Sequence, residues 1–147
     1  MKILMVCLGN ICRSPLAEGI LQSKVSKEVI VDSAGTSGFH QGELPDSRSI
    51  AVAKKYGIDL TNQRSRKFTS KDFDTFDVIY AMDYSNYRDI IALALTEEDK
   101  GKVKMILNES FLGEDRNVPD PYYGGEMGFE NVYAMLEEAC VKIASKI

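Results

Sequence analysis

The feature that most constrains the fold is a set of four short apolar runs separated by segments with helical spacing. The first run, residues 2–6, is continuous and is typical of a strand covered on both faces. The others lie at residues 29–31, 77–82 and 102–107. Strands that alternate with helices indicate right-handed crossovers. The sequence therefore predicts an α/β fold with three layers, α/β/α, around a central four-stranded parallel sheet.

The segments between these runs predict five helices. The first should begin at Ser14-Pro15, because proline suits the first turn of a helix. Asp46 is expected to cap the second, and Gly57 to end it. The other three are expected near residues 69–73, 86–95 and 129–143, whereas residues 58–67 and 114–125 are expected to be irregular.

The composition excludes several classes of protein. A chain of 147 residues fits a single domain, which we expect to span residues 1–147. No run approaches the ~18 consecutive apolar residues of a membrane-spanning helix. With 18 basic against 22 acidic residues the net charge is −4, without the basic excess of a nucleic-acid-binding domain. We expect no membrane insertion, no nucleic-acid partner, and a monomer or weak dimer.

The three cysteines, Cys7, Cys12 and Cys140, do not form the pattern of a secreted disulfide framework. The opening apolar run is too short for a signal peptide and has no small-residue cleavage site after it. A reducing, cytoplasmic location is therefore expected. His40 is the only histidine, so the chain offers no zinc ligand set. Cys140 lies on the apolar stripe of the last helix and is expected to serve packing.

The segment Cys7–Ser14 lies between the first predicted strand and the first predicted helix. Gly9 and Asn10 tolerate left-handed backbone, so this loop can curl and point its N–H groups inward. Such a loop at a helix N-terminus binds anions, and Arg13 adds a planar fork that matches two phosphate oxygens. In that field Cys7 should be a thiolate at neutral pH, placed as a nucleophile beneath a bound phosphate.

Each of these residues also has a simpler interpretation. Cys7 taken singly could be an inert buried cysteine, and Arg13 a solvated residue of a first helical turn. A cysteine and an arginine at this spacing occur by chance in many chains. The preceding strand, the Gly-Asn turn and the Ser-Pro helix start are separate requirements, however. Together they favour a phosphate-binding loop after the first strand.

The octapeptide Cys7–Ser14, followed by Pro15, Ala17 and Glu18, closely resembles the signature loop of the low-molecular-weight protein tyrosine phosphatases. The resemblance extends over nearly the whole chain. It includes residues 31–38, 72–77 and 82–86, and the segment Asp120-Pro121-Tyr122-Tyr123-Gly124, which is similar to the general-acid loop of that family.

The resemblance implies a role for each matching residue. Cys7 would be the nucleophile that forms a phosphocysteine, Arg13 would bind the phosphoryl oxygens, and Asp120 would act as general acid and then as general base. The rest of the phosphate-binding loop would be Leu8, Gly9, Asn10, Ile11, Cys12 and Ser14. Phosphotyrosine-containing proteins would be the substrates and inorganic phosphate a product, with no cofactor and no metal.

The resemblance also implies supporting residues. Asn10, Ser14 and Ser33 match a hydrogen-bonded set that holds the loop. Asp83 would either orient Arg13 or cap the following helix. Phe39, Tyr122 and Tyr123 match positions that form the walls of the substrate cleft, where aromatic rings suit a phenyl phosphate. For Phe39 the alternative is a side chain that anchors its loop on the core.

Three rival functions remain open. A protein-arginine phosphatase of the same family would tend to carry threonine where this chain has Ile11, and Ile11 favours an aryl phosphate. An arsenate reductase shares the loop but needs further cysteines in the middle of the chain, where this sequence has none. A phosphate-binding module without catalysis would have no reason to combine the thiol, the arginine and the distant Asp120.

The second cysteine of the loop suggests redox protection. Cys12 follows Cys7 by five residues in a curled segment, so the two sulfurs could be neighbours. We hypothesise that peroxide converts Cys7 to a sulfenic acid, which Cys12 traps as a disulfide.

Some positions depart from the family pattern or have no assigned role. Asn62 stands near a position where the family often has a histidine that supports the loop. His40 falls in a variable loop, and no catalytic role is expected for it. The basic cluster Arg64, Arg66 and Lys67 is expected to be a solvated face.

Overall fold

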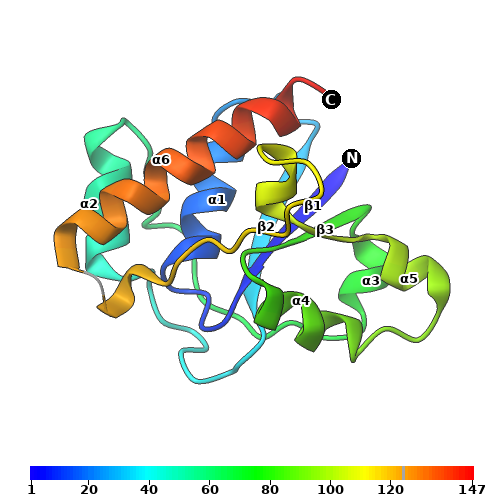
Figure 1. Ribbon diagram of the computed structural model, residues 1–147. Helices are drawn as coiled ribbons and strands as arrows, with labels where there is room; N and C mark the ends of the chain where they lie inside the picture. The colour runs from blue at the N-terminus through cyan, green and yellow to red at the C-terminus, as the bar shows by residue number, and fades with distance from the viewer. Residues whose placement is uncertain (124) are drawn as a thin grey trace.

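The computed structural model describes residues 1–123 and 125–147, without the side chains of residues 123, 125 and 126. It is a parallel sheet between two layers of helices, as predicted (Figure 1). Within the described residues the elements follow in this order: β1 (Lys2–Cys7), α1 (Arg13–Gln22), β2 (Ile30–Gly35), α2 (Ser47–Lys55), α3 (Asp72–Thr75), β3 (Val78–Ala81), α4 (Tyr84–Ile91), α5 (Glu97–Gly101), β4 (Val103–Met105), the 3₁₀ helices η1 (Ile106–Glu109) and η2 (Pro121–Tyr123), and α6 (Gly125–Ala144).

The four strands are parallel and have the order β2-β1-β3-β4. β1 pairs with β2 on one side and with β3 on the other, in the register Ile3↔Val31 and Ile3↔Val78. From β1 the chain first adds β2 on one side and then β3 and β4 on the other, so the order in which strands are added reverses between β1 and β3. In such folds ligands bind at the carboxyl ends of the strands, at this switch point. The loop that follows Cys7 therefore lies at the position where this fold binds ligands.

The side chains of β1 alternate between two apolar layers. Ile3, Met5 and Cys7 face the larger one, which contains the buried faces of α1 and α6 together with part of α2. Leu4 and Val6 face the smaller one, formed with α3, α4 and the phenylalanines around them. Figure 1 shows α6 lying across α1 on one side of the sheet, with α3 and α4 away from it. A strand buried on both faces explains the uninterrupted apolar run.

Several predicted boundaries were wrong by a few residues. The second strand extends from Ile30 to Gly35 and not only over 29–31, and the last predicted strand ends at Met105, where a 3₁₀ turn begins. The helix predicted over 69–73 is α3, shifted to Asp72–Thr75. The helix predicted over 86–95 covers Tyr84–Ile91 because Asp83 caps it. The last helix begins at Gly125, at the end of the segment 114–125 that was predicted to be irregular.

The sequence analysis missed α5, which is short and has no buried residue, and the two 3₁₀ helices η1 and η2. The apolar Ile106 and Leu107 of η1 had been assigned to the strand predicted over 102–107. The Asp46 cap of α2 is confirmed, since its carboxylate accepts a hydrogen bond from the Arg48 N–H at 2.8 Å. Gly57, at φ +82°, follows the end of α2 as predicted.

Cys140 is fully buried against α1, in line with a packing role. Among the described residues, no helix combines the length and apolar character needed to cross a bilayer.

Candidate active site

The loop after β1 folds back over the end of β2. Asn10 has a left-handed backbone, with φ 55°, as the Gly-Asn pair predicted. The carbonyls of Cys7 and Leu8 accept hydrogen bonds from the N–H groups of Thr36 and Ser37, each at 2.9 Å. A Cβ at Gly35 would lie 2.8 Å from the Leu8 carbonyl oxygen, so only glycine allows this close approach. The end of β2 thus fixes the path of the loop.

A buried chain of polar side chains links this loop to Cys7. Asn10 donates to the hydroxyls of Ser14, at 2.8 Å, and Ser33, at 3.0 Å. The side-chain oxygen Asn10 Oδ1 accepts from the Arg66 backbone N–H at 3.1 Å. Ser14 Oγ in turn lies 3.0 Å from Cys7 Sγ, within hydrogen-bond distance. Because buried polar groups with partners resist rearrangement, this network holds the nucleophile candidate in one place.

Arg13 is buried and points its guanidinium toward the same site. Its Nη1 donates to Asp83 Oδ2 at 2.7 Å and to the Val118 carbonyl at 2.9 Å. Burial opposes the charged form, but the negative charges of Cys7, Asp83 and Asp120 outweigh it and raise the pKa of Arg13. Arg13 is therefore a permanent, oriented cation beside the sulfur.

Asp83 serves both of the functions considered for it. One carboxylate oxygen binds Arg13, and the other accepts from the Asn86 N–H at 2.7 Å, capping α4. A single side chain at the carboxyl end of β3 thus links the start of α4 to the arginine.

Asp120 reaches the site from the other side, on the loop before α6. The Val118 N–H donates to the Met82 carbonyl at 2.8 Å, which attaches this loop to the end of β3. Asp120 Oδ2 then lies 3.9 Å from Arg13 Nη2. Its other oxygen accepts from the Tyr122 N–H at 3.0 Å, and the side chain is 38% exposed. The carboxylate is close to the arginine but open to solvent.

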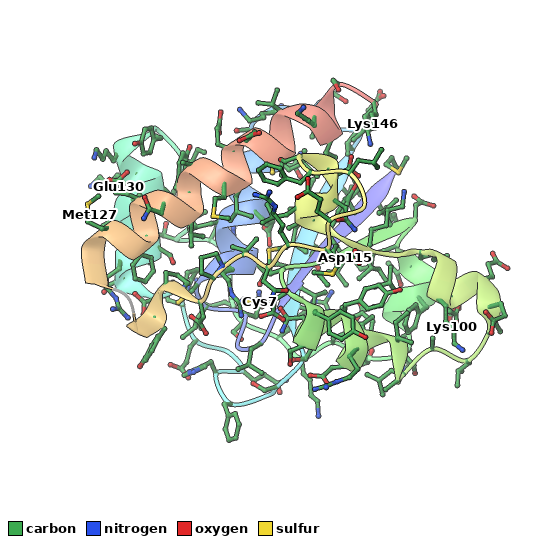
Figure 2. The ribbon with its side chains drawn as sticks, viewed as in Figure 1. Cys7, Lys100, Asp115, Met127, Glu130 and Lys146 are labelled. Atoms are coloured by element: carbon green, nitrogen blue, oxygen red, sulfur yellow. The ribbon has the colours of Figure 1, made fainter. Side chains whose placement is uncertain are left out.

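These groups surround one pocket of about 180 Å³, lined by Cys7, Leu8, Gly9, Ile11, Cys12, Arg13, His40, Asp120 and Tyr122. Every predicted loop residue except Asn10 and Ser14 lines it, and those two lie buried behind it in the hydrogen-bond network. A larger hollow of about 560 Å³ lies along β4, where Figure 2 labels Asp115 and Lys146, but it contains no thiol and no unpaired arginine among its described lining residues.

The aromatic wall differs from the prediction. Phe39 is 89% exposed and does not line the pocket, so it neither forms the cleft wall nor anchors its loop on the core. His40 takes that position, with its ring against Gly9 and its Nδ1 2.9 Å from Glu43 Oε2. Sequence reasoning missed His40 because neighbouring loop residues point in directions that the sequence does not fix. Tyr122 lines the pocket, whereas the side chain of Tyr123 lies outside the described residues.

One further expectation was wrong, and it concerns Arg66 in the basic cluster. Arg66 is not part of a solvated basic face: its guanidinium binds the carboxylates of Asp72 and Asp32, at 3.1 and 3.2 Å. Asn62 is exposed, and its half-buried neighbour Gln63 is the residue that faces α1, donating to the Pro15 carbonyl at 3.1 Å. Which charged or polar side chains of this segment are buried thus depends on neighbours that are distant in the sequence.

Glu18 extends the network on the α1 side. Its carboxylate accepts from Ser33 Oγ at 2.7 Å. Burial raises the pKa of Glu18 to about 7, opposed by the hydrogen bond from Ser33, while nearby Asp32 raises it further. A group that titrates near neutral pH therefore lies three hydrogen bonds from the Ser14–Cys7 contact.

Cys12 lies in the pocket wall as a buried free thiol. Burial, with a contribution from the charge of Asp46, raises the pKa of Cys12 to about 12. Cys12 is thus protonated at neutral pH, and its proposed disulfide with Cys7 stays a prediction. Among residues 1–123 and 125–147, no group of His, Cys, Asp and Glu side chains is arranged to hold a metal ion.

The comparisons with known proteins agree with this geometry. The family model described as low molecular weight phosphotyrosine protein phosphatase matches residues 2–147. The human low molecular weight phosphotyrosine protein phosphatase is 40% identical, over 95% of this chain and 90% of its own length.

Two solved structures extend the agreement to the fold. A protein tyrosine phosphatase from Entamoeba histolytica, with Hepes in its active site, is 41% identical and superposes with a TM-score of 0.92 over 99% of this chain and 96% of that one. A Drosophila arginine phosphatase is 35% identical, with a TM-score of 0.91 over 99% and 97% of the two chains.

The fold and the site are thus those of a hydrolase, in the class of phosphatases. The chain belongs to the low molecular weight phosphotyrosine protein phosphatase family. This confirms the resemblance found in the loop sequence.

Proposed function

We propose that the chain hydrolyses phosphotyrosine in proteins, and small aryl phosphates, through a phosphocysteine intermediate on Cys7. The observation that carries the proposal is the convergence of three groups on one pocket: the Cys7 thiol, the Arg13 guanidinium and the Asp120 carboxylate. These groups come from β1, α1 and the loop before α6, so a common packing role does not explain their meeting.

In the first step, the Cys7 thiolate attacks phosphorus and forms an S–P bond, while the bond from phosphorus to the phenolic oxygen breaks. Asp120 gives its proton to that departing oxygen. Arg13 and the N–H groups of the loop bind the phosphoryl oxygens, whose negative charge they stabilise during transfer. The N-terminus of α1 contributes in the same direction.

In the second step, water attacks the phosphorus of the phosphocysteine, and the Asp120 carboxylate accepts a proton from it. The S–P bond breaks, inorganic phosphate is released and Cys7 returns as a thiolate. Ser14 Oγ, 3.0 Å from the sulfur, can donate a hydrogen bond to that thiolate. The cycle needs no cofactor and no metal, since the arginine and the loop supply the positive potential.

The second candidate is hydrolysis of phosphoarginine in proteins, which the similarity to a Drosophila arginine phosphatase favours. Against it stands Ile11, a half-buried apolar side chain in the pocket wall. An apolar wall suits a phenyl ring and disfavours burial of a charged guanidinium that has no partner there.

The test is a comparison of kcat/KM for three peptides of one sequence that carry phosphotyrosine, phosphoarginine or phosphoserine. We expect hydrolysis of the phosphotyrosine peptide to be the fastest. Preference for the phosphoarginine peptide would assign the second candidate function. The Ile11→Thr variant tests the role of Ile11: if it has the same ratio of kcat/KM for the phosphotyrosine and phosphoarginine peptides as the wild type, Ile11 does not cause the preference.

A further inference from the structure

Arg48, in the first turn of α2, contacts both sides of the pocket without lining it. Its Nε and Nη2 donate to the two oxygens of Asp46, both at 3.0 Å. Its Nη1 donates to the backbone carbonyl of Tyr122 at 3.1 Å. The planar fork thus connects two segments that lie 74 residues apart in the sequence.

The partner of Arg48 is itself attached to the phosphate-binding loop. The Asp46 N–H donates to the Ile11 carbonyl at 2.7 Å, and the Asp46 carboxylate caps α2. The hydrogen bonds with Arg48 hold the pKa of Asp46 below its ordinary value, so it stays ionised. Arg48 is therefore held in position from the side of the loop that contains Cys7.

On the opposite side, the guanidinium packs on two aromatic rings. Its Cζ lies 5.1 Å from the ring centre of Tyr122 and 4.7 Å from that of Phe129, which is 2% exposed. Arginine stacks on aromatic faces more favourably than lysine does. These contacts place Arg48 against the acid loop and against the buried start of α6.

The same residue, Tyr122, connects Arg48 to Asp120. The Tyr122 N–H donates to Asp120 Oδ1 at 3.0 Å, while its carbonyl accepts from Arg48. Asp120 is exposed and its charge contact with Arg13 is long, at 3.9 Å. A carboxylate on such a loop depends on the backbone around it for its direction, because a displacement of about 1 Å can cost 10²-fold in rate.

We propose that Arg48 is a positioning residue that holds the Asp120 loop in the geometry required for proton transfer. It acts through the Tyr122 backbone and does not touch the substrate. The proposal rests on the proposed function of Asp120 as general acid. Loss of Arg48 should therefore impair proton donation to the leaving group while phosphate binding by the loop of residues 7–14 persists.

The experiment measures kcat/KM for phenyl phosphate, whose leaving group needs a proton, and for 2,4-dinitrophenyl phosphate, whose leaving group does not. The variants are Arg48→Met, Arg48→Lys and Asp120→Asn. The matched control is Lys55→Met, because Lys55 lies on the same helix and pairs with Glu130 of α6 at 2.7 Å without reaching the acid loop. Figure 2 labels Glu130 and Met127 on the first turns of α6.

We expect Arg48→Met to lower kcat/KM for phenyl phosphate by roughly 10- to 100-fold, part of the 10²–10⁴ that an acid supplies. The value for 2,4-dinitrophenyl phosphate and inhibition by inorganic phosphate should stay unchanged. Arg48→Lys should recover little, since one ammonium cannot replace the fork. Lys55→Met should preserve the ratio between the two substrates.

An equal loss on both substrates in Arg48→Met, or no loss on either, would overturn the positioning role. Failure of the proposed function would look different. In that case Asp120→Asn itself would show no dependence on the leaving group, and the assignment of Asp120 as acid would fall together with that of Arg48.

Discussion

The two sides of the pocket are fixed by different kinds of contact. On the side of residues 7–14, the groups are buried: Asn10, Ser14 and Ser33 are each less than 5% exposed and bind one another. On the side of residues 118–122, Asp120 is 38% exposed. The loop there is attached through the backbone of Val118, which binds Met82 and Arg13, and through the charged side chain of Arg48. The comparison teaches that the Cys7 side of the pocket is built into the sheet edge, whereas the Asp120 carboxylate reaches the pocket from the surface.

The largest expected effect comes from the sulfur at the centre of the buried side. Cys7→Ser should abolish hydrolysis of p-nitrophenyl phosphate, because an alcohol is a much weaker nucleophile than a cysteine sulfur. Phosphate should still bind, since the loop N–H groups and Arg13 are retained. Steady-state kinetics and titration calorimetry with phosphate measure the two. Residual turnover near the wild-type level would exclude a covalent mechanism on Cys7.

The next largest effect tests whether the buried side needs the arginine fork. Arg13→Lys keeps the charge but loses the planar fork. The fork donates to Asp83 and to the Val118 carbonyl, and in the proposed mechanism it also binds phosphate. We expect kcat/KM to fall by about 10⁴, since each lost donor of this kind is worth about 10². Inhibition by phosphate should weaken in parallel. A change confined to kcat would mean that Arg13 does not bind the ground-state phosphate.

A smaller effect, confined to turnover, is expected on the exposed side. Asp120→Asn should lower turnover of phenyl phosphate by roughly 10²–10⁴ and leave phosphate inhibition intact, because the loop of residues 7–14 is untouched. This split between rate and binding separates the two sides of the pocket kinetically. Loss of phosphate binding in Asp120→Asn would show that the two sides are not independent.

The smallest effect concerns the outer end of the buried network. Burial raises the pKa of Glu18 to about 7, above its ordinary value of 4.5, so the folded chain binds an extra proton between these pH values. The contribution of Glu18 to stability is therefore complete below pH 4.5 and is lost as the pH rises through 7. The loss is on the order of 3 kcal/mol.

Glu18→Gln keeps an acceptor for Ser33 and removes the titration. Urea unfolding at pH 5 and pH 8 should show a smaller decrease of stability with pH in this variant than in the wild type. Asp74→Asn, on an exposed side chain of α3, is the matched control. Equal pH dependence in the Glu18 variant and the wild type would contradict a buried carboxyl that titrates near neutrality.

Much of the buried side could be predicted from sequence because its determinants are local. The apolar run before Cys7, the Gly-Asn turn and the Asp46 cap each act within a few residues. The exposed side could not be predicted in the same way. Arg48 is two residues from Asp46 but 74 from Tyr122, and nothing in the sequence joins it to the acid loop. His40 lines the pocket in place of Phe39 for a similar reason, since the orientation of this loop depends on packing against Gly9.

The same distinction explains the helices. α1 and α6 have apolar stripes that pack on the sheet, and their existence followed from periodicity. α5 has no buried residue among its five, so only its Thr96 cap and acidic first turn favour a helix there. Arg66 looked like surface because the two aspartates that bind it, Asp32 and Asp72, come from segments on either side of it in the sequence.

The most direct test of the account is to trap the intermediate. Asp120→Asn should still accept a phosphoryl group from 2,4-dinitrophenyl phosphate but lack the base that activates water for its release. After acid quenching, intact-mass and peptide mass spectrometry should find one added phosphoryl group on the peptide that contains Cys7. Turnover of this substrate without any phosphorylated Cys7, or a phosphoryl group on another residue, would contradict the central claim that Cys7 is the nucleophile.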